Sequence, residues 1–214
     1  MESNSLYSGI STVKNLKGEF IWVSNEAIKL IGLSKYEQKT DFDLPCAASE
    51  YAETFQQQDK KALTTGPLII MDVHVYSSGL HAILTEKKPF YNDSKLIGVI
   101  CNSICITHKS LISKLIHLDQ DLFYRELIGS YYVGENNDDP RDLTEREQEI
   151  LFYAIRGFSA KNIGRELNIS SKIVEFHIDT LKNKFSANNE QELISIALKN
   201  DYLKYIPASF TKYY

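Results

Sequence analysis

Five basic side chains stand close together near the end of the chain, and their chemistry suits the binding of phosphate groups. They are Lys161, Arg165, Lys172, Lys182 and Lys184. Lysine and arginine donate charge-assisted hydrogen bonds to phosphate oxygens. Within residues 160–185 these five bases are opposed by three acids, Glu166, Glu175 and Asp179, so the local charge balance is +2. We predict that these bases, together with the hydroxyl group of Ser170, hold the backbone of a polyanion.

Helices must position these bases, and the sequence marks where the first two begin and end. Thr144 followed three residues later by Glu147 is a capping box, which predicts a helix start. Gly157 is expected to end this helix, and Ser159 to cap a second one. The side chains expected to face the interior are Ile150, Leu151, Ala154, Ile155, Ala160, Ile163 and Leu167.

A third helix follows a tight turn. Asn168 is expected to make the turn, because asparagine tolerates a left-handed backbone better than most residues. Gly164 provides the small side chain that lets the next helix cross closely. Ser170 or Ser171 is expected to cap the third helix, whose buried stripe at steps of four, three and four residues is Val174, Ile178, Leu181 and Phe185.

The outward face of the third helix then carries Lys172, Glu175, Phe176, Asp179 and Lys182 or Asn183. An exposed ridge on a helix that two others anchor has about the width of a DNA major groove. Glu175 and Asp179 could accept hydrogen bonds from cytosine amino groups, and Phe176 could contact a thymine methyl group. His177 lies near the buried stripe, so we expect it to pack or to hydrogen-bond within the fold.

This stretch resembles the LuxR-type helix-turn-helix family. The shared pattern is L-T-x-R-E-x-E-[IV]-L, then G-x-S-x-K-x-I, then L-x-I-S-x-x-x-V-x-x-H-x-x-x-[IL]-x-x-K-[LF]. The resemblance implies that double-stranded DNA is a partner and that the third helix enters its major groove. It also implies that a fourth helix, residues 189–200, pairs two subunits through Leu193, Ile194, Ala197 and Leu198. Packing of the fourth helix on its own domain is the alternative.

The departures from the family pattern leave two hypotheses open. Many members have Thr where Ile173 stands, Lys where Glu175 and Asp179 stand, and Arg where Glu190 stands. Each acid on the exposed face replaces attraction to the DNA backbone by repulsion. The chain is therefore either a dimeric, sequence-specific transcription regulator or an interaction protein that pairs with a related regulator and binds DNA weakly or not at all.

The first half of the chain predicts an antiparallel sheet. Three strand-like runs, residues 68–76, 80–90 and 95–107, are separated by short turn sequences that contain Gly79 and Asp93. Such short links imply a meander of neighbouring strands. In the first of these runs the alternation predicts that Ile69, Met71, Val73 and Val75 face the core, while Asp72 and His74 face solvent.

The first half also resembles the PAS family, in FIWVSNEAIKLIGLSKYE (20–37), QQDKKALTTG (57–66) and KPFYNDSKLIGVICNSICIT (88–107). In the first segment the family has a strand, an Asn-led helix and a second helix at GLSxxE. The resemblance implies a module that senses a small molecule or a protein and often dimerises. No match to the flavin-binding cysteine motif exists, and the histidines His74, His81 and His108 are isolated, so neither flavin nor haem is expected. The cofactor is otherwise unknown, and a packed core without a ligand is equally compatible.

A connector joins the two halves. Residues 107–130 are expected to be helical, with a heptad-like seam of Leu111, Leu115, Leu118 and Leu122 that either extends a dimer or packs on its own domain. The polar residues 131–142 are expected to be a linker. The expected fold class is α+β with two domains: a PAS-like sheet domain at 1–106, the connector and linker at 107–142, a four-helix LuxR-type domain at 143–200 and an aromatic tail at 201–214.

Composition excludes several other classes. No apolar run is long enough to span a bilayer and no secretory signal is visible, so a cytoplasmic protein is expected. Cys46, Cys101 and Cys105 have no metal-ligand spacing and are expected to be buried apolar residues. The formal charge is −5 for residues 1–140 (13 basic, 18 acidic) and +1 for residues 141–214 (11 basic, 10 acidic). No P-loop, kinase motif or nucleophilic triad is present, so an enzyme is not expected.

Overall fold

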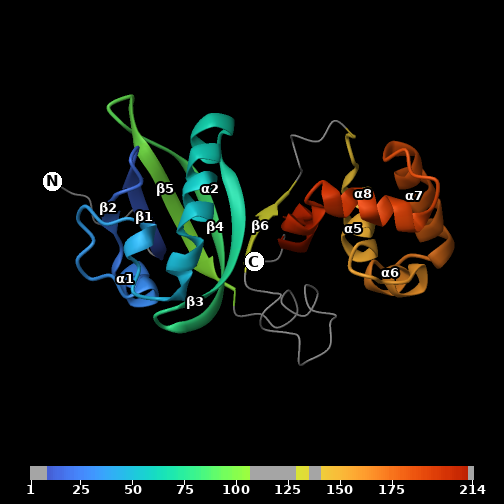
Figure 1. Cartoon of the computed structure of the whole chain (residues 1–214), viewed down its shortest axis with the longest axis horizontal. Coiled ribbons are helices and arrows are strands. Elements are labelled where there is room, and N and C mark those ends of the chain that lie inside the picture. The colour runs from blue at the N-terminus through green and yellow to red at the C-terminus, as the bar shows by residue number, and fades with distance from the viewer. Residues whose placement is uncertain (1–8, 107–128, 135–140, 212–214) are drawn as a thin grey trace. The chain divides into compact units, whose positions relative to one another are not determined.

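The computed structural model describes residues 9–106, 129–134 and 141–211 of the chain. The chain divides into two compact units, residues 1–130 and 131–214 (Figure 1). None of the helices within these described ranges is long and apolar enough to cross a membrane.

The first unit contains an antiparallel sheet whose strands lie in the order β2-β1-β5-β4-β3. The strands are β1 (Ile10–Asn15), β2 (Phe20–Val23), β3 (Leu68–Tyr76), β4 (Gly79–Asn92) and β5 (Lys95–Cys105). The meander predicted for β3, β4 and β5 is confirmed. Asp93 and Ser94 adopt φ values of 47° and 64° in the link between β4 and β5, which is the backbone of a tight hairpin turn.

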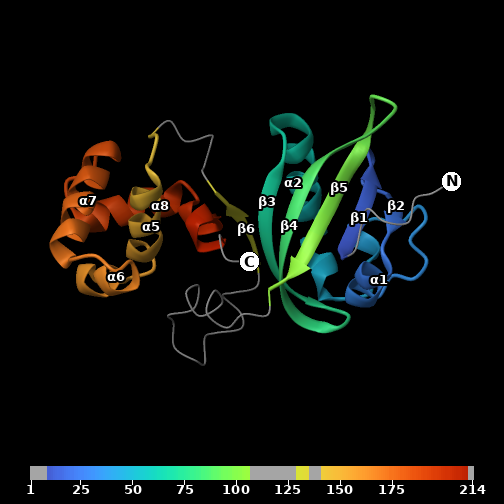
Figure 2. The same cartoon turned by 180° about the vertical axis from the view of Figure 1, so that it is seen from behind.

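The helices between β2 and β3 lie on one face of this sheet, as Figures 1 and 2 show. They are α1 (Asn25–Ile31), the 3₁₀ helices η1 (Asp41–Asp43) and η2 (Ala47–Tyr51), and α2 (Ala52–Thr65). The Ser24 side chain caps α1 by accepting a hydrogen bond from the backbone N–H of Ala27. This order of strands and helices is PAS-like, as expected.

The helix expected at the GLSKYE segment is not formed, because residues 33–40 contain no helix. Gly32 ends α1 with a left-handed backbone (φ 76°), and Gln38 turns the chain again at φ 63°. Two left-handed residues within one short segment are incompatible with a continuous helix.

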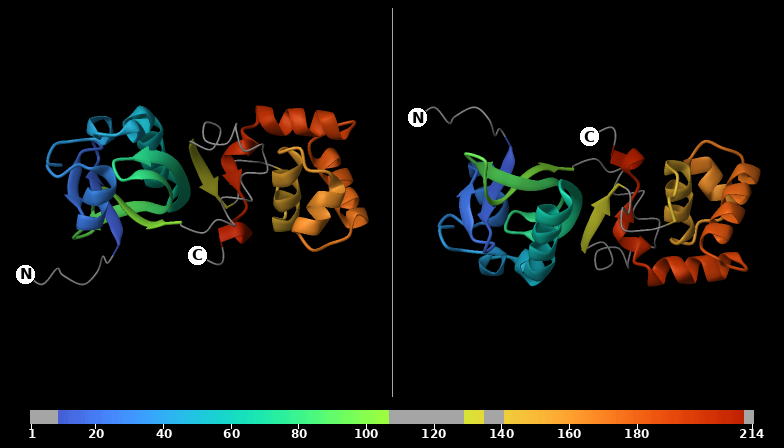
Figure 3. Two further views of the ribbon diagram at one scale, coloured as in Figure 1. Left: turned by 90° about the horizontal axis from the view of Figure 1, so that it is seen from below. Right: turned by 90° about the horizontal axis from the view of Figure 1, so that it is seen from above.

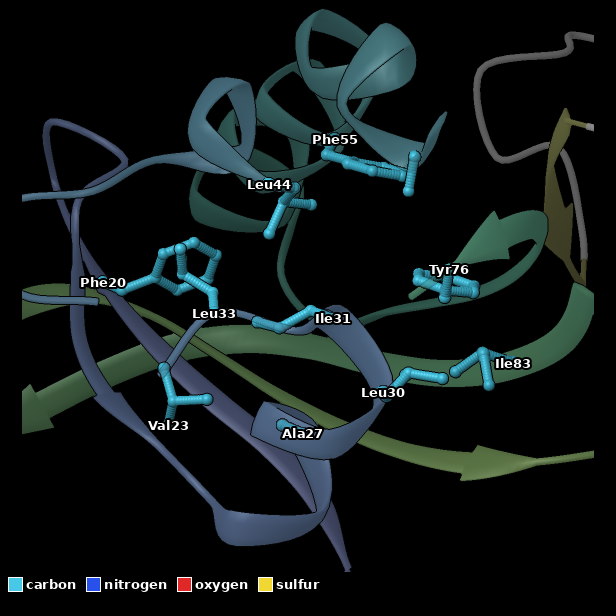
Figure 4. Packing of buried hydrophobic residues seen from close by; sticks show 11 residues of the cluster. Phe20, Val23, Ala27, Leu30, Ile31, Leu33, Leu44, Phe55, Tyr76 and Ile83 are labelled. Atoms are coloured by element: carbon cyan, nitrogen blue, oxygen red, sulfur yellow. The ribbon is translucent and has the colours of Figure 1, made fainter. Parts of the chain in front are cut away.

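The core of the first unit lies between the sheet and these helices (Figure 4). Phe20 and Val23 from β2 meet Ala27, Leu30 and Ile31 from α1. The other members of the cluster are Leu33, Leu44, Ala48, Phe55, Tyr76 and Ile83. Cys101 is buried, as expected, whereas Cys46 and Cys105 are only half-buried, and all three thiols are free.

The prediction for β3 was right for Met71 and Val73, which are 0% and 6% exposed, but wrong in leaving the other face to solvent, because the middle of the strand is buried on both faces. Asp72 and His74, expected in solvent, are 5% and 0% exposed, whereas Ile69 and Val75, expected in the core, are 44% and 39% exposed. The reason is that α2 and η2 cover the polar face. His74 packs against the ring of Tyr51, with centroids 4.2 Å apart.

The second unit is built on four helices, α5 (Glu145–Ala154), α6 (Ala160–Glu166), α7 (Ser171–Lys184) and α8 (Glu190–Lys199), seen from two further sides in Figure 3. The four-helix prediction for this region is confirmed. The capping box at Thr144 and Glu147 is also confirmed. The helix predicted to end at Gly157 ends earlier, at Ala154, and Gly157 adopts φ 83° in the turn that follows.

The aromatic tail packs on its own unit. The chain continues through η3 (Tyr202–Lys204), β7 (Tyr205–Ile206) and η4 (Ala208–Thr211). The Phe210 ring lies 5.0 Å from Phe152 and 5.5 Å from Tyr153, both on α5.

The expected linker starts with a strand. β6 (Gly129–Val133) pairs in parallel with β7, so that Tyr132 stands opposite Tyr205, and sequence reasoning missed both strands. The predicted seam of Leu111, Leu115, Leu118 and Leu122 lies outside the described residues.

Candidate nucleic-acid interface

The two helices that precede α7 hold it in place. Ser159 and Ser170 cap α6 and α7, because each hydroxyl oxygen accepts a hydrogen bond from a backbone N–H three residues on, at 3.3 Å. Ser170, and not Ser171, is thus the cap of α7. Both α5 and α6 pack against α7. The caps set the start of each helix and therefore the face that each presents.

The turn between α6 and α7 depends on two residues. Asn168 adopts φ 53°, the left-handed conformation predicted for it. A Cβ atom at Gly164 would lie 2.6 Å from the carbonyl oxygen of Ile169, so only glycine permits this close approach. The role predicted for Gly164 is therefore confirmed.

The buried stripe of α7 is confirmed. Val174 and Leu181 are 0% exposed, and Ile178 and Phe185 are 6% and 4% exposed. Because these positions recur at helical spacing, they define the opposite face of α7. That face carries the exposed side chains Lys172, Ile173, Glu175, Phe176, Asp179 and Asn183.

The polar groups on the exposed face differ in their partners. Asp179 forms an ion pair with Lys182, with Oδ1 2.7 Å from Nζ. Glu175 has no ion pair or side-chain hydrogen bond within the described part of the chain. The hydroxyl of Thr180 donates back to the carbonyl oxygen of Phe176, at 3.1 Å. Glu175 is therefore the carboxylate on this face that is available for an external donor.

The five predicted bases fall into two groups, because Lys182 and Lys184 form ion pairs, with Asp179 and Glu147 respectively, and the other three form none among the described residues. Lys161 and Lys172 are exposed and form no ion pair with any described residue, and Arg165 is exposed with a 3.5 Å contact from Nη2 to Asn162 Oδ1. Lys184 differs, because its Nζ lies 2.8 Å from both Glu147 Oε2 and the carbonyl oxygen of Asp142. The carboxylate of Glu147 is nearly buried. Burial alone would raise the pKa of Glu147, but the hydrogen bonds from Lys184 and Thr144 outweigh it and lower the pKa. Lys184 therefore stabilises the fold, and its ammonium group already has two partners within it.

The pairing surface predicted on α8 is smaller than expected. Leu193 and Ala197 are 0% exposed, because α8 packs on α7 and on η3. They cannot meet a second subunit in this fold. Ile194 is half-buried and Leu198 is 39% exposed, so these two residues remain from the predicted set.

The first unit contains a cavity of about 80 Å³ between the sheet and the helices. Its apolar wall includes Ala27, Leu30 and Ile31, which belong to the core cluster in Figure 4. Its polar wall contains Lys14, Asp41, Thr12, Asp72, Thr85, Lys87 and Ser103. Thr85 and Ser103 share a hydrogen bond of 2.9 Å between their hydroxyl oxygens.

The charged side chains at this cavity form a buried network. Lys14 Nζ lies 2.5 Å from Asp41 Oδ2 and 2.9 Å from Asp59 Oδ2, and Lys87 Nζ lies 2.8 Å from Asp59 Oδ1. Burial would lower the pKa of Lys14, but Asp41 and Asp59 raise it above its ordinary value. Burial would raise the pKa of Asp59, but the two lysines lower it to about 2. Lys14 and Asp59 therefore both carry their charges at neutral pH.

Burial also shifts the pKa values of two neighbouring groups, in each case by disfavouring the charged form. Asp72 accepts hydrogen bonds from Gln58 and Ser130, yet burial raises its pKa. Burial lowers the pKa of His74 to about 4. The described residues contain no cluster of histidine, cysteine and acidic side chains that could hold a metal ion. Sequence reasoning missed the ion network, although lysine in a strand beside apolar residues, as at Lys14 and Lys87, was its signal.

Residues 141–197 match the family model for bacterial regulatory proteins of the luxR family. Among curated proteins, the probable transcriptional regulator ycf29 of Cyanophora paradoxa is 29% identical over 141 residues, which cover 66% of this chain and 61% of the relative. The transcriptional regulatory protein DegU of Brevibacillus brevis is 34% identical over 135 residues, which cover 61% of this chain and 57% of the relative. The chain thus spans less than two thirds of the length of these relatives.

A similar solved structure is that of the Vibrio cholerae VqmA dimer in the absence of its target DNA. It is 28% identical to this chain, with a TM-score of 0.49, and the alignment covers 96% of this chain and 88% of that one.

Proposed function

We propose that the chain is a cytoplasmic, dimeric, sequence-specific DNA-binding transcription regulator whose DNA binding is modulated by its PAS-like unit. The match of residues 141–197 to the luxR family model supports this proposal. The observation that carries the proposal is the geometry of α7. Its buried stripe is complete, and its opposite face is exposed over several turns. A helix held in this way fits the major groove.

Phosphate anchoring in this proposal falls mainly to the exposed bases Lys161, Arg165 and Lys172. They flank the outward face and, apart from the Asn162 contact of Arg165, have no partners within the described ranges. Lys182 and Ser170 contribute at the two ends of α7. Lys184 contributes long-range attraction only, because Glu147 and Asp142 occupy its ammonium group.

Selection of bound sequences from a random DNA pool, followed by footprinting, tests this function. We expect one selected sequence with rough two-fold symmetry and a steep fall of affinity with salt. The variant Lys172→Ala should reduce the slope of log affinity against log salt by about 1. Lys35→Ala changes another exposed lysine, in the first unit; it is the matched control and should leave the slope unchanged.

Two outcomes would contradict the proposal. Equal binding to all sequences would remove the claim of specificity. A complete absence of binding, with retained pairing to a related regulator, would favour the interaction protein instead.

Dimerisation is proposed to use the exposed part of α8, with Ile194 and Leu198 at its centre. Sedimentation of the full chain should give a dimer, and Leu198→Glu should weaken it. Leu203→Glu is the matched control, because Leu203 is similarly exposed, at 44% against 39%, but stands on η3. Equal weakening by both variants would contradict this surface.

Modulation is proposed to act through an uncharged ligand in the cavity of the first unit. Lys14 and Lys87 are balanced by Asp41 and Asp59, and burial favours the neutral form of Asp72. An ionised ligand would add an uncompensated charge at a buried site, which is strongly unfavourable. A cavity of about 150 Å³ holds a benzene ring, so one of about 80 Å³ takes a smaller group unless the helices move.

Mass spectrometry of small molecules released from the purified full chain tests for this ligand. We expect an uncharged compound that is depleted in the variant Thr85→Val, which removes a polar group from the cavity wall. Thr64→Val makes the same change on the exposed side of α2 and should retain the compound. A released compound that is ionised at neutral pH, or no compound at all, would contradict the ligand proposal without touching DNA binding.

A further inference from the structure

We propose that Glu175 and Phe176 read the DNA bases while Asp179 does not, and that the target contains a cytosine next to a thymine in each half-site. This inference rests on the proposed function. It assigns separate roles to three side chains that the exposed face of α7 brings together.

Glu175 is the group suited to select cytosine. Its carboxylate is exposed and unpaired among the described residues, so both of its oxygens are available to accept hydrogen bonds in the groove. In the major groove, guanine presents two acceptors and thymine presents an acceptor and a methyl group, and both repel a carboxylate. Adenine places its amino donor beside the N7 acceptor, whereas cytosine presents its amino donor alone. Cytosine is therefore the base that satisfies Glu175 without repulsion.

Asp179 is a positioning residue for a phosphate contact. Its Oδ1 lies 2.7 Å from Lys182 Nζ, so the acid and the base form a pair on one side of α7. An exposed pair of this kind contributes little to stability. Its effect is to hold the ammonium group beside the helix, where it offsets the repulsion between Asp179 and the DNA backbone.

Phe176 supplies the apolar contact. Its side chain is 67% exposed, and Ile173, three residues earlier on the same side of the helix, is 46% exposed. Covering an exposed aromatic ring with an apolar group lowers the free energy, because apolar surface is removed from water. The thymine methyl is the main apolar group on the floor of the major groove.

The spacing makes the two bases neighbours. Consecutive residues of an α-helix rise by about 1.5 Å, and base pairs are stacked about 3.4 Å apart. Glu175 and Phe176 are consecutive and both exposed, so two neighbouring bases lie within reach of the two side chains. The thymine can stand on either strand.

Selection from a random DNA pool with three forms of the full chain tests the assignment of the acids. Glu175→Gln keeps the shape but offers an amide, which pairs with adenine. It should move the preference at one position from cytosine to adenine by about tenfold or more. Asp179→Asn should select the wild-type sequence, with affinity changed equally on all DNA. A shift of sequence with Asp179→Asn, or none with Glu175→Gln, would overturn the assignment.

Base analogues in the selected site test the contacts directly. Replacing the thymine by uracil removes only the methyl group, so it should weaken binding of the wild type several-fold and leave Phe176→Ala unaffected. Replacing the cytosine by 2-pyrimidinone removes only the amino group and should weaken the wild type but not Glu175→Gln. Equal losses for wild type and variant would contradict the contact concerned.

Failure of this inference is distinguishable from failure of the proposed function. If the wild type selects no sequence, both fail. If it selects one that does not depend on Glu175 or Phe176, the function stands and the assignment falls. All three substituted side chains are exposed, so circular dichroism should show unchanged folding.

Discussion

At the scale of single residues, the first unit is unusual for the charge that it buries. Lys14, Asp59 and Lys87 are 4%, 6% and 3% exposed, respectively, and they join β1, α2 and β4. Removing one partner from such a network leaves an uncompensated charge, whereas an exposed pair can be removed at little cost. The buried and exposed pairs of this chain can therefore be compared within one fold.

Lys14→Met should lower the free energy of unfolding of the first unit by about 3–5 kcal/mol. Lys39→Met, which breaks the exposed pair with Asp43, is the matched control and should cost less than about 1 kcal/mol. Urea unfolding followed by the fluorescence of Trp22 measures the difference, because this single tryptophan lies in β2. Similar losses for both variants would show that the network is solvated.

His74 predicts a dependence of stability on pH. Burial lowers its pKa to about 4 in the folded chain, against 6.5 for an ordinary histidine. Below pH 6.5 the unfolded chain binds a proton that the folded chain does not, so stability falls as the pH is lowered from about 6.5 to about 4. The full difference is about 3 kcal/mol. Asp72 Oδ1, 3.9 Å from His74 Nε2, faces the ring and would reduce the effect wherever Asp72 is charged.

Unfolding of the first unit between pH 4 and pH 7, again followed by Trp22, checks this. The variant His74→Asn should be less stable at pH 7 but should lose the part of the slope that lies between pH 6.5 and pH 4. An unchanged slope would assign the pH dependence to the carboxylates instead.

At the scale of elements, the second unit depends on a few local backbone choices. Gly164 permits α6 to approach the start of α7, and Asn168 makes the turn between them. Gly164→Ala should therefore push α7 away from α6, because the contact at 2.6 Å is with backbone and cannot be relieved by a side-chain rotation. We expect a loss of about 1–3 kcal/mol in the stability of the second unit. Thermal unfolding followed by circular dichroism, with binding to the selected DNA, measures both effects.

Ser171→Ala is a suitable control for this change, since Ser171 follows the capping residue and its hydroxyl caps neither helix. It should leave stability and DNA binding close to wild type. A Gly164→Ala variant that matches the control would mean that the turn can relax.

The same elements show what local sequence signals can predict. Helix caps and tight turns involve residues close in sequence, so the local pattern was sufficient to predict the caps at Thr144, Ser159 and Ser170 and the turn at Asn168. The burial of Asp72 and His74 on β3 was not predicted, because alternation shows that a strand has two faces but not that helices cover the polar one. The ion network and the pairing of β6 with β7 join residues far apart in sequence, which no local pattern reports. For α7, the pattern identified the outward residues, whereas the pairing of Asp179 with Lys182 required side-chain positions.

At the scale of the whole molecule, charge is divided between the two halves. Residues 1–140 carry −5 and residues 141–214 carry +1. A DNA duplex repels the first part, and this repulsion is screened by salt. Residues 141–214 alone should therefore bind non-specific DNA more tightly than the full chain at low salt, and the difference should shrink as salt is raised. Fluorescence anisotropy with a labelled duplex at several salt concentrations measures it, and a difference that is independent of salt would contradict an electrostatic cause.

The attachment of Lys184 has a mechanical consequence for the second unit. Its ammonium group donates a hydrogen bond to the carbonyl oxygen of Asp142. The guanidinium carbon of Arg141 lies 4.3 Å from the ring centroid of Phe185. The residues through which the chain enters this unit are thus tied to the last turn of α7. A pull or twist on the chain at residue 141 would therefore reach the end of α7 through these two contacts.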